Sequence, residues 1–382
     1  MSAMDAHWWT LPGPAAFLRA AWEDVRGGKN VLLALPATAP PGLRDALATL
    51  VRQAEMWAWR DFSAGDGVGG PAALVEQLHQ RFAPSRVSGA VLNADTLAGD
   101  PRLADTMIWV EGMTATCWPT WCAFLGQYER ACQMRPEQGR GLFCVLLTGQ
   151  VAGQVPEPAV ALTVRRWWGV VGGVDLLLDL SLRADGRPMP ALHRRLALAV
   201  ACELSGTDAA LARALAGLGL RELLEPQEFL RAEAARRGWN AARARRPNWE
   251  DGLIDAVNGE DVVHSVALAS RGDEAELRRR IWQAEVAVLY PFLEEQRLQL
   301  LPRLRPYLRL PVETAYGPVD DIYDLELGQL VYFLRGRNLP RELWRLLTLL
   351  TDMRHALAHL RPVPIEYLFV DGLLREPRES RR

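Results

Sequence analysis

The chain has 382 residues, of which 49% are hydrophobic and 24% charged, and its formal net charge is −2. This length and composition are typical of a folded globular protein with more than one domain and exclude an intrinsically disordered chain. The near-neutral charge also excludes a protein that attracts nucleic acid through its overall field, which leaves only a local basic patch for that purpose.

The cysteines and the distribution of apolar residues bear on the compartment. The five cysteines are odd in number and include no Cys-x-x-Cys pair, so we expect reduced thiols and not a disulfide framework or a zinc ribbon. No apolar run reaches about 18 residues, and the N-terminus lacks a basic segment followed by an apolar core. We therefore expect a cytoplasmic protein without membrane association.

The first half of the chain alternates short apolar runs with amphipathic segments, which predicts a parallel sheet covered by helices on both faces. The runs expected to form strands are 31–35, 106–112, 142–149 and 160–164. A Gly/Pro-rich loop over 36–44 and a helix follow the first of them. Strand, loop and helix in this order mark the place where a phosphate-binding loop would lie.

The loop departs from a working phosphate-binding loop at each chemically necessary position. When Gly42 is aligned with the second glycine of that motif, Ala37 takes the place of the first glycine, Leu43 that of the lysine and Arg44 that of the Mg²⁺-binding hydroxyl residue. The only lysine of the chain, Lys29, precedes the strand. No residue can therefore serve as the phosphate lysine.

Glu111 ends the run 106–112, where a Walker B carboxylate would stand; a helix cap or an ion-pair partner is the alternative for such a residue. This order of elements resembles that of AAA-type or STAND-type P-loop ATPases. The resemblance implies a degenerate nucleotide-binding core with Gly42, Arg44 and Glu111 as candidate cofactor-binding residues. ATPase activity is not expected. We expect no cofactor, and residual binding of ATP with Mg²⁺ is the alternative.

The remainder of the chain is expected to be helical. We predict an α/β domain over 1–185, a helical extension over 186–270 and a C-terminal helical bundle over 271–382. The turn at 183–188 marks the first boundary, and the polar tail 375–382 is expected to be disordered. The fold class predicted is thus α/β followed by all-α.

An amphipathic helix near the C-terminus carries the second candidate site. Leucines recur along it at three- and four-residue steps, and Pro362 and Pro364 end it. Arg354 falls among the leucines, whereas His355 and His359 share another face, so a straight helix alone does not bring the arginine to His359. The histidines have the spacing of a zinc pair, but without a third ligand cluster we expect no metal.

The segment from Arg354 to His359 resembles the Arg-x4-His signature of HEPN domains, with His355 at the position where asparagine is commoner. In that family the motif often forms a metal-independent ribonuclease site at a dimer interface, and many members are non-catalytic. The resemblance implies catalytic roles for Arg354, His355 and His359. Apart from the resemblance, Glu326 could orient Arg354 across the bundle. Histidine suits such chemistry as a base, and arginine as a clamp for phosphate charge.

Two functions remain open at this point. One is an RNA-cleaving effector, acting as a homodimer, in which an inactive NTPase-like module regulates a HEPN-type nuclease. The other is a non-catalytic scaffold or adaptor subunit that contacts other proteins in a larger complex; Arg354 is then a paired interface residue and His359 a cation at a helix end. Such pairings of modules resemble bacterial antiviral and conflict proteins, so defence is the expected setting of both.

Overall fold

The computed structural model describes residues 7–54, 57–65, 69–84, 91–135, 139–183, 189–315 and 317–370. The chain divides into two compact units. The sheet unit consists of Met1–Asp179, Gly206–Ala210 and Arg245–His264, and the helical unit of Leu180–Ser205, Leu211–Ala244 and Ser265–Arg382.

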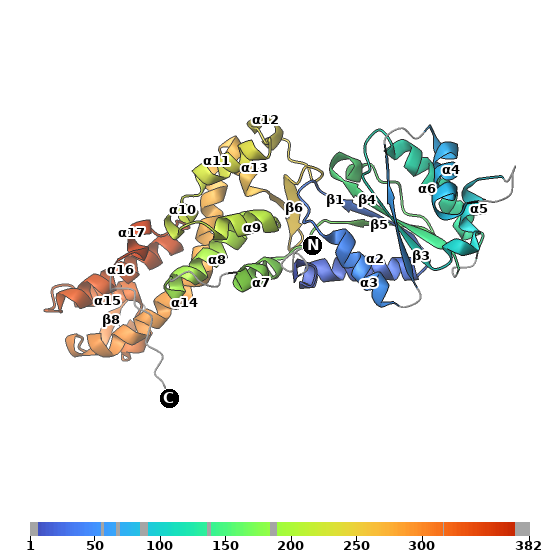
Figure 1. Ribbon diagram of the computed structural model, residues 1–382. Helices are drawn as coiled ribbons and strands as arrows, with labels where there is room; N and C mark the ends of the chain where they lie inside the picture. The colour runs from blue at the N-terminus through green and yellow to red at the C-terminus, as the bar shows by residue number, and fades with distance from the viewer. Residues whose placement is uncertain are drawn as a thin grey trace. The chain divides into compact units, whose positions relative to one another are not determined.

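The sheet unit is built on five parallel strands in the order β2-β3-β4-β1-β5 (Figure 1). They are β1 (Asn30–Leu35), β2 (Ala58–Ser63), β3 (Thr106–Glu111), β4 (Gly141–Thr148) and β5 (Leu162–Arg166). All six residues of β1 are buried, because the strand lies inside the sheet with both faces covered. The predicted α/β class and parallel sheet are therefore confirmed.

Helices cover both faces of this sheet (Figure 1). One face carries α2 (Pro12–Arg26) and α3 (Leu43–Gln53), and the other carries α4 (Pro71–Phe82), α5 (Ala94–Ala98) and α6 (Trp118–Gln133). Under α6, Trp121, Phe124 and Tyr128 pack edge-on against Phe143 of β4 with ring centroids 4.9–6.3 Å apart. These aromatic residues of α6 thus form part of the core.

A later segment of the chain returns to the sheet unit. The strands β6 (Ile254–Val257) and β7 (Glu260–Val263) form an antiparallel hairpin. The Asp255 carboxylate accepts hydrogen bonds from the Gly169 N–H at 2.9 Å and the Thr207 hydroxyl at 2.7 Å, which hold the hairpin in place. The helix expected over this stretch was wrong.

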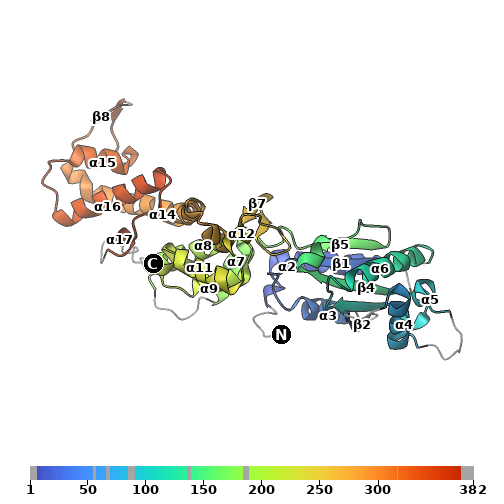
Figure 2. The same ribbon diagram turned by 90° about the horizontal axis from the view of Figure 1, so that it is seen from above.

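The helical unit is organised around α14 (Glu274–Leu304), a helix of 31 residues that continues through two internal prolines. It packs along α8 (Ala191–Ser205) and α16 (Arg341–Ala358), and α15 (Leu327–Leu334) packs on α16 (Figures 1 and 2). The other helices of the unit are α10 (Leu220–Leu224), α11 (Gln227–Arg236), α12 (Ala241–Ala244), α13 (Ser265–Arg271) and α17 (Ile365–Leu368). The hairpin β8 (Val312–Thr314) and β9 (Gly317–Val319) completes it.

Two helices run across the chain division: α7 (Gly173–Arg183) and α9 (Ala209–Ala216) begin in the sheet unit and end in the helical unit. The predicted boundary at residue 185 and the predicted disordered tail at 375–382 lie outside the described residues. Among the described residues, no helix is both long enough and apolar enough to span a lipid bilayer.

Candidate functional site

A pocket opens at the carboxyl ends of β1, β3 and β4, the edge at which open parallel sheets bind their ligands. Its volume is about 430 Å³. The loop between β1 and α3 lines one side, and the ends of the other two strands line the rest, through Trp109, Glu111, Leu146, Thr148 and Gly149. Gly42, Arg44 and Glu111, the residues predicted as a weak cofactor site, all line this one pocket.

Gly42 is the residue that turns the loop into α3. Its φ of 92° lies in the left-handed region, which side chains other than glycine enter only at a cost. The following Leu43, at the place of the lysine, is only 4% exposed and belongs to the core. The left-handed turn at Gly42 leads directly into α3, and the position aligned with the lysine carries a packed apolar side chain.

The Arg44 guanidinium is already occupied by carboxylates. Its Nε and Nη2 donate to the two carboxylate oxygens of Asp61 at 2.9 and 2.8 Å, and its Nη1 donates to Asp45 at 2.8 Å. The hydrogen bonds from Arg44 lower the pKa of Asp61, so the pair is held in its charged form. Arg44 consequently links the first turn of α3 to strand β2 through these hydrogen bonds.

Glu111 is an exposed carboxylate at the end of β3. One oxygen accepts a hydrogen bond from the Trp109 indole at 2.9 Å. Trp109 is fully buried and stacks on Trp59 of the neighbouring strand with centroids 5.7 Å apart. The carboxylate therefore stands at the place expected for a Walker B acid and is fixed there by an aromatic side chain.

The loop itself offers few N–H groups to an anion. Pro36, Pro40 and Pro41 have none. The N–H of Ala37 donates to the Glu250 carbonyl at 2.9 Å, and that of Ala39 donates back to Pro36 at 3.1 Å. Five of the nine positions from 36 to 44 are thus without an N–H or use it within the protein.

The second candidate site lies at the carboxyl end of α16. Arg354 is half-buried, and its Nη1 lies 2.8 Å from the Glu326 carboxylate and its Nε 3.9 Å from that of Glu294. Burial acts to lower the pKa of Arg354, but the bonds to Glu326 and Tyr290 outweigh it and raise that pKa above its ordinary value. Glu326 thus contacts Arg354, and its role in orienting a catalytic arginine stays a prediction.

The two histidines form a separate group. The rings of His355 and His359 are exposed and lie with centroids 4.1 Å apart. His359 caps the helix, and Leu360 follows it with a positive φ of 57°. Among the described contacts of Arg354, neither imidazole occurs. The structure thus brings the histidines together and places the arginine with carboxylates.

Two residues of α14 that the sequence did not single out hold the end of α16. The Trp282 indole donates to the Leu357 carbonyl at 2.8 Å, and the Glu285 carboxylate accepts the Val363 N–H at 2.7 Å. Glu285 is 1% exposed, and its burial raises its pKa to about 8. Both contacts join residues more than seventy positions apart, so no local pattern could have shown them.

The described residues contain no group of three His, Cys, Asp or Glu side chains arranged to hold a metal ion. A comparison with models of known protein families finds no match, and a search of curated proteins also finds none. The class that the fold itself defines is an α/β protein with a five-stranded parallel sheet, extended by helices.

Proposed function

We propose that this protein is a non-hydrolysing adaptor subunit whose NTPase-like sheet and helical unit serve as interaction surfaces in a multi-protein bacterial defence complex. The observation that carries the proposal is the loop at the mouth of the sheet pocket, which has no lysine and offers no N–H to an anion at five of its nine positions. The setting in defence rests on the resemblance of roughly the first half of the chain to P-loop ATPases and of roughly its last third to HEPN domains.

Phosphate binding at such a loop needs free backbone N–H groups and a lysine. Because of three prolines and two committed N–H groups, five of the nine loop positions offer no donor, and Leu43 is buried where the lysine would stand. The charge that remains at the mouth includes the exposed Glu111, while Arg44 is paired with two carboxylates. A triphosphate would meet an acidic group without the cations that normally offset it.

The helical unit presents an apolar side chain in a costly conformation. Leu360 has a left-handed backbone and is 69% exposed, so the conformation costs about 1–2 kcal/mol without burying the side chain. Hydrogen bonds from the Leu360 N–H to the Leu357 carbonyl at 3.2 Å and from the Arg361 N–H to the Ala356 carbonyl at 3.0 Å hold this conformation. Contact between this helix end and a partner protein would give Leu360 the burial that it lacks.

The first test is an assay of phosphate release with Mg²⁺ and labelled ATP. We expect the wild-type protein and Glu111→Gln to release no phosphate above the blank. Hydrolysis by the wild-type protein that Glu111→Gln abolishes would end the proposal. Gentle purification from the native host is expected to bring one partner in a fixed ratio, and recovery of the chain alone counts against an adaptor.

A second candidate function is a HEPN-type ribonuclease. It is favoured by the two exposed imidazoles at the end of α16 and by an arginine held in one orientation on the same helix. Such a site would need a second copy of the chain to bring a cation to the histidines, because Arg354 already contacts Glu326. RNA, a homodimer and catalysis by Arg354, His355 and His359 belong to this candidate.

RNA cleavage in the presence of a chelator distinguishes the two candidates. The adaptor account expects no cleavage by the wild-type protein. The nuclease account expects cleavage that is lost in Arg354→Ala and in His359→Ala but retained in Arg345→Ala, a matched change on the same helix. Cleavage at equal rates in all four proteins would point to a contaminating nuclease and remove this candidate.

A further inference from the structure

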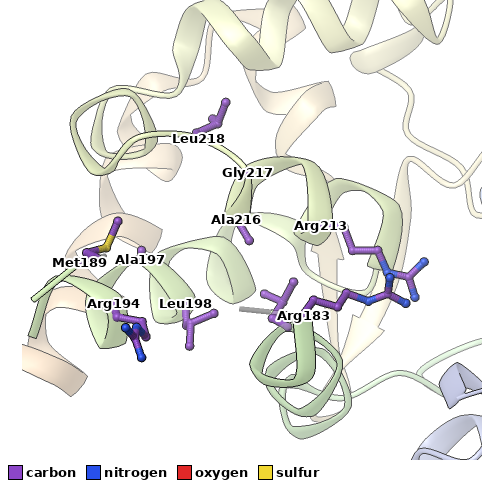
Figure 3. A pocket seen from close by; sticks show the side chains of 10 residues that line it. Arg183, Met189, Arg194, Ala197, Leu198, Arg213, Ala216, Gly217 and Leu218 are labelled. Carbon is purple, nitrogen blue, oxygen red and sulfur yellow. The ribbon is translucent and has the colours of Figure 1, made fainter. Parts of the chain in front are cut away.

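The helical unit contains a pocket that neither candidate site uses (Figure 3). Its volume is about 240 Å³, and it lies among the last turn of α7, the first half of α8 and the end of α9. The residues that line it come in two kinds, apolar and basic, and none of its described lining residues is acidic.

The apolar part of the lining is formed by leucine, methionine and alanine side chains, among them Leu180, Leu198 and Ala216. The basic part consists of Arg183, Arg194 and Arg213. In Figure 3 Arg183 and Arg213 extend toward the same side of the pocket, whereas Arg194 lies across Leu198 from them. A ligand in this pocket would therefore have guanidinium groups on two sides of an apolar body.

The position of Arg194 is electrostatically unfavourable in the absence of an anion. It stands at the start of α8, and the first turn of that helix has no acidic residue. The positive end of the helix dipole favours anions and disfavours a cation at this place. Arg183 and Arg213, in contrast, stand in the last turns of α7 and α9, where a cation is favourable.

Arg183 and Arg213 also take part in other interactions within the protein. A guanidinium carries five N–H donors and can therefore serve more than one partner. The inference therefore does not need either residue to be free. It needs only that the three arginines line one pocket, as they do.

From this pocket we infer a binding site for a small organic carboxylate with a branched aliphatic or aromatic body. A cavity of about 150 Å³ binds benzene, and pockets for drug-sized ligands begin at about 300 Å³, so this pocket suits a body slightly larger than a benzene ring. The carboxylate accepts from the arginine forks, for which its planar geometry is matched. Free metabolites and the last residue of a peptide both present this chemistry.

The probe is 4-methylpentanoate, a leucine-like body with one carboxylate, titrated calorimetrically into the full-length protein. We expect saturable binding of the acid. The affinity for 4-methylpentanamide should be lower by about tenfold or more, because a hydrogen bond to a charged group is lost. Inorganic phosphate tests whether the site is only an anion trap and is expected not to compete. Equal affinity for acid and amide, or full competition by phosphate, would overturn the inference.

Variants locate the binding in this pocket. Arg194→Gln should weaken binding of 4-methylpentanoate about tenfold. Arg195→Gln is the same change one position along α8, outside the lining, and should leave the affinity unchanged. Ala197→Leu should abolish binding by filling the pocket, and thermal melting confirms that each variant is folded. Equal effects of the two arginine changes, or unaltered binding in Ala197→Leu, would place the ligand elsewhere and refute the site.

A final pair of probes distinguishes the two sources of the carboxylate. A short peptide ending in leucine is compared with its C-terminally amidated form. Binding of the free-acid peptide at least as tight as that of 4-methylpentanoate assigns the pocket to a protein C-terminus. Binding of the small acid alone assigns it to a free metabolite. Either result supports the site, and failure of both acids to bind contradicts it without bearing on the adaptor proposal.

Discussion

The buried Glu285 should make the end of α16 less stable as pH rises. Burial raises the pKa of Glu285 from 4.5 to about 8. Between these values the folded protein keeps a proton that the unfolded chain has released, so the free energy of unfolding falls with increasing pH. The effect is absent below pH 4.5 and complete above about pH 8.

The magnitude follows from the interval between the two pKa values. At about 1.36 kcal/mol for each tenfold change in proton affinity, the step from 4.5 to about 8 is at most about 5 kcal/mol. Glu285→Gln keeps an oxygen that can accept the Val363 N–H but carries no titratable proton. Near pH 5 the variant and the wild-type protein should therefore be similar, whereas near pH 9 the variant should be the more stable.

Hydrogen exchange followed by mass spectrometry measures the local stability of the end of α16, in fragments that cover residues 357–368. We expect exchange in the wild-type protein to be faster than in Glu285→Gln near pH 9 and equal near pH 5. The control is Glu295→Gln, which removes an exposed carboxylate from the same helix and should match the wild-type protein at both values. An identical ratio of exchange rates at the two pH values would refute the reasoning.

Three further substitutions, two in the sheet unit and one in the helical unit, are tested by urea unfolding. Asn30→Ala leaves the buried N–H of Phe143 unpaired and should cost about 2–3 kcal/mol; a loss below about 0.5 would mean that the Asn30 bond contributes little. Gly42→Ala places a side chain at a φ of 92° and should cost about 1–2 kcal/mol, whereas no loss would show that the turn relaxes. Trp282→Phe removes the donor to the Leu357 carbonyl and should cost about 1 kcal/mol, and unchanged stability would show that water replaces the indole.

The interior of the sheet could be predicted because its strands are buried on both faces and form continuous apolar runs. Strands β1, β3 and β4 lie within two residues of their predicted positions. The edge strand β2 escaped prediction because its exposed side chains break that pattern, with Arg60 and Asp61 in its middle.

The sequence of the β6–β7 hairpin carries a local turn signal. Its turn is Asn258-Gly259, with φ of 54° and 84°, and this dipeptide is the strongest short-range mark of a two-residue hairpin. The surrounding alanine- and arginine-rich segments favour helix, which explains the expectation of continuous helix there.

The candidate residues of the sheet pocket could be predicted because their places depend on the order of the strands. Gly42, Arg44 and Glu111 come together wherever β1 and β3 are parallel neighbours of β4. The partners of Arg44 and Arg354 could not be predicted, since Asp61 and Glu326 approach them through tertiary packing. These ion pairs decide whether the two arginines are free to bind a phosphate.

The most direct test of the account is a calorimetric titration of the full-length protein with ATP and Mg²⁺. The loop of prolines, the buried Leu43 and the paired Arg44 predict no saturable heat up to millimolar nucleotide. Saturable binding in the micromolar range, weakened by Glu111→Gln, would contradict the claim that the sheet pocket has lost its phosphate chemistry.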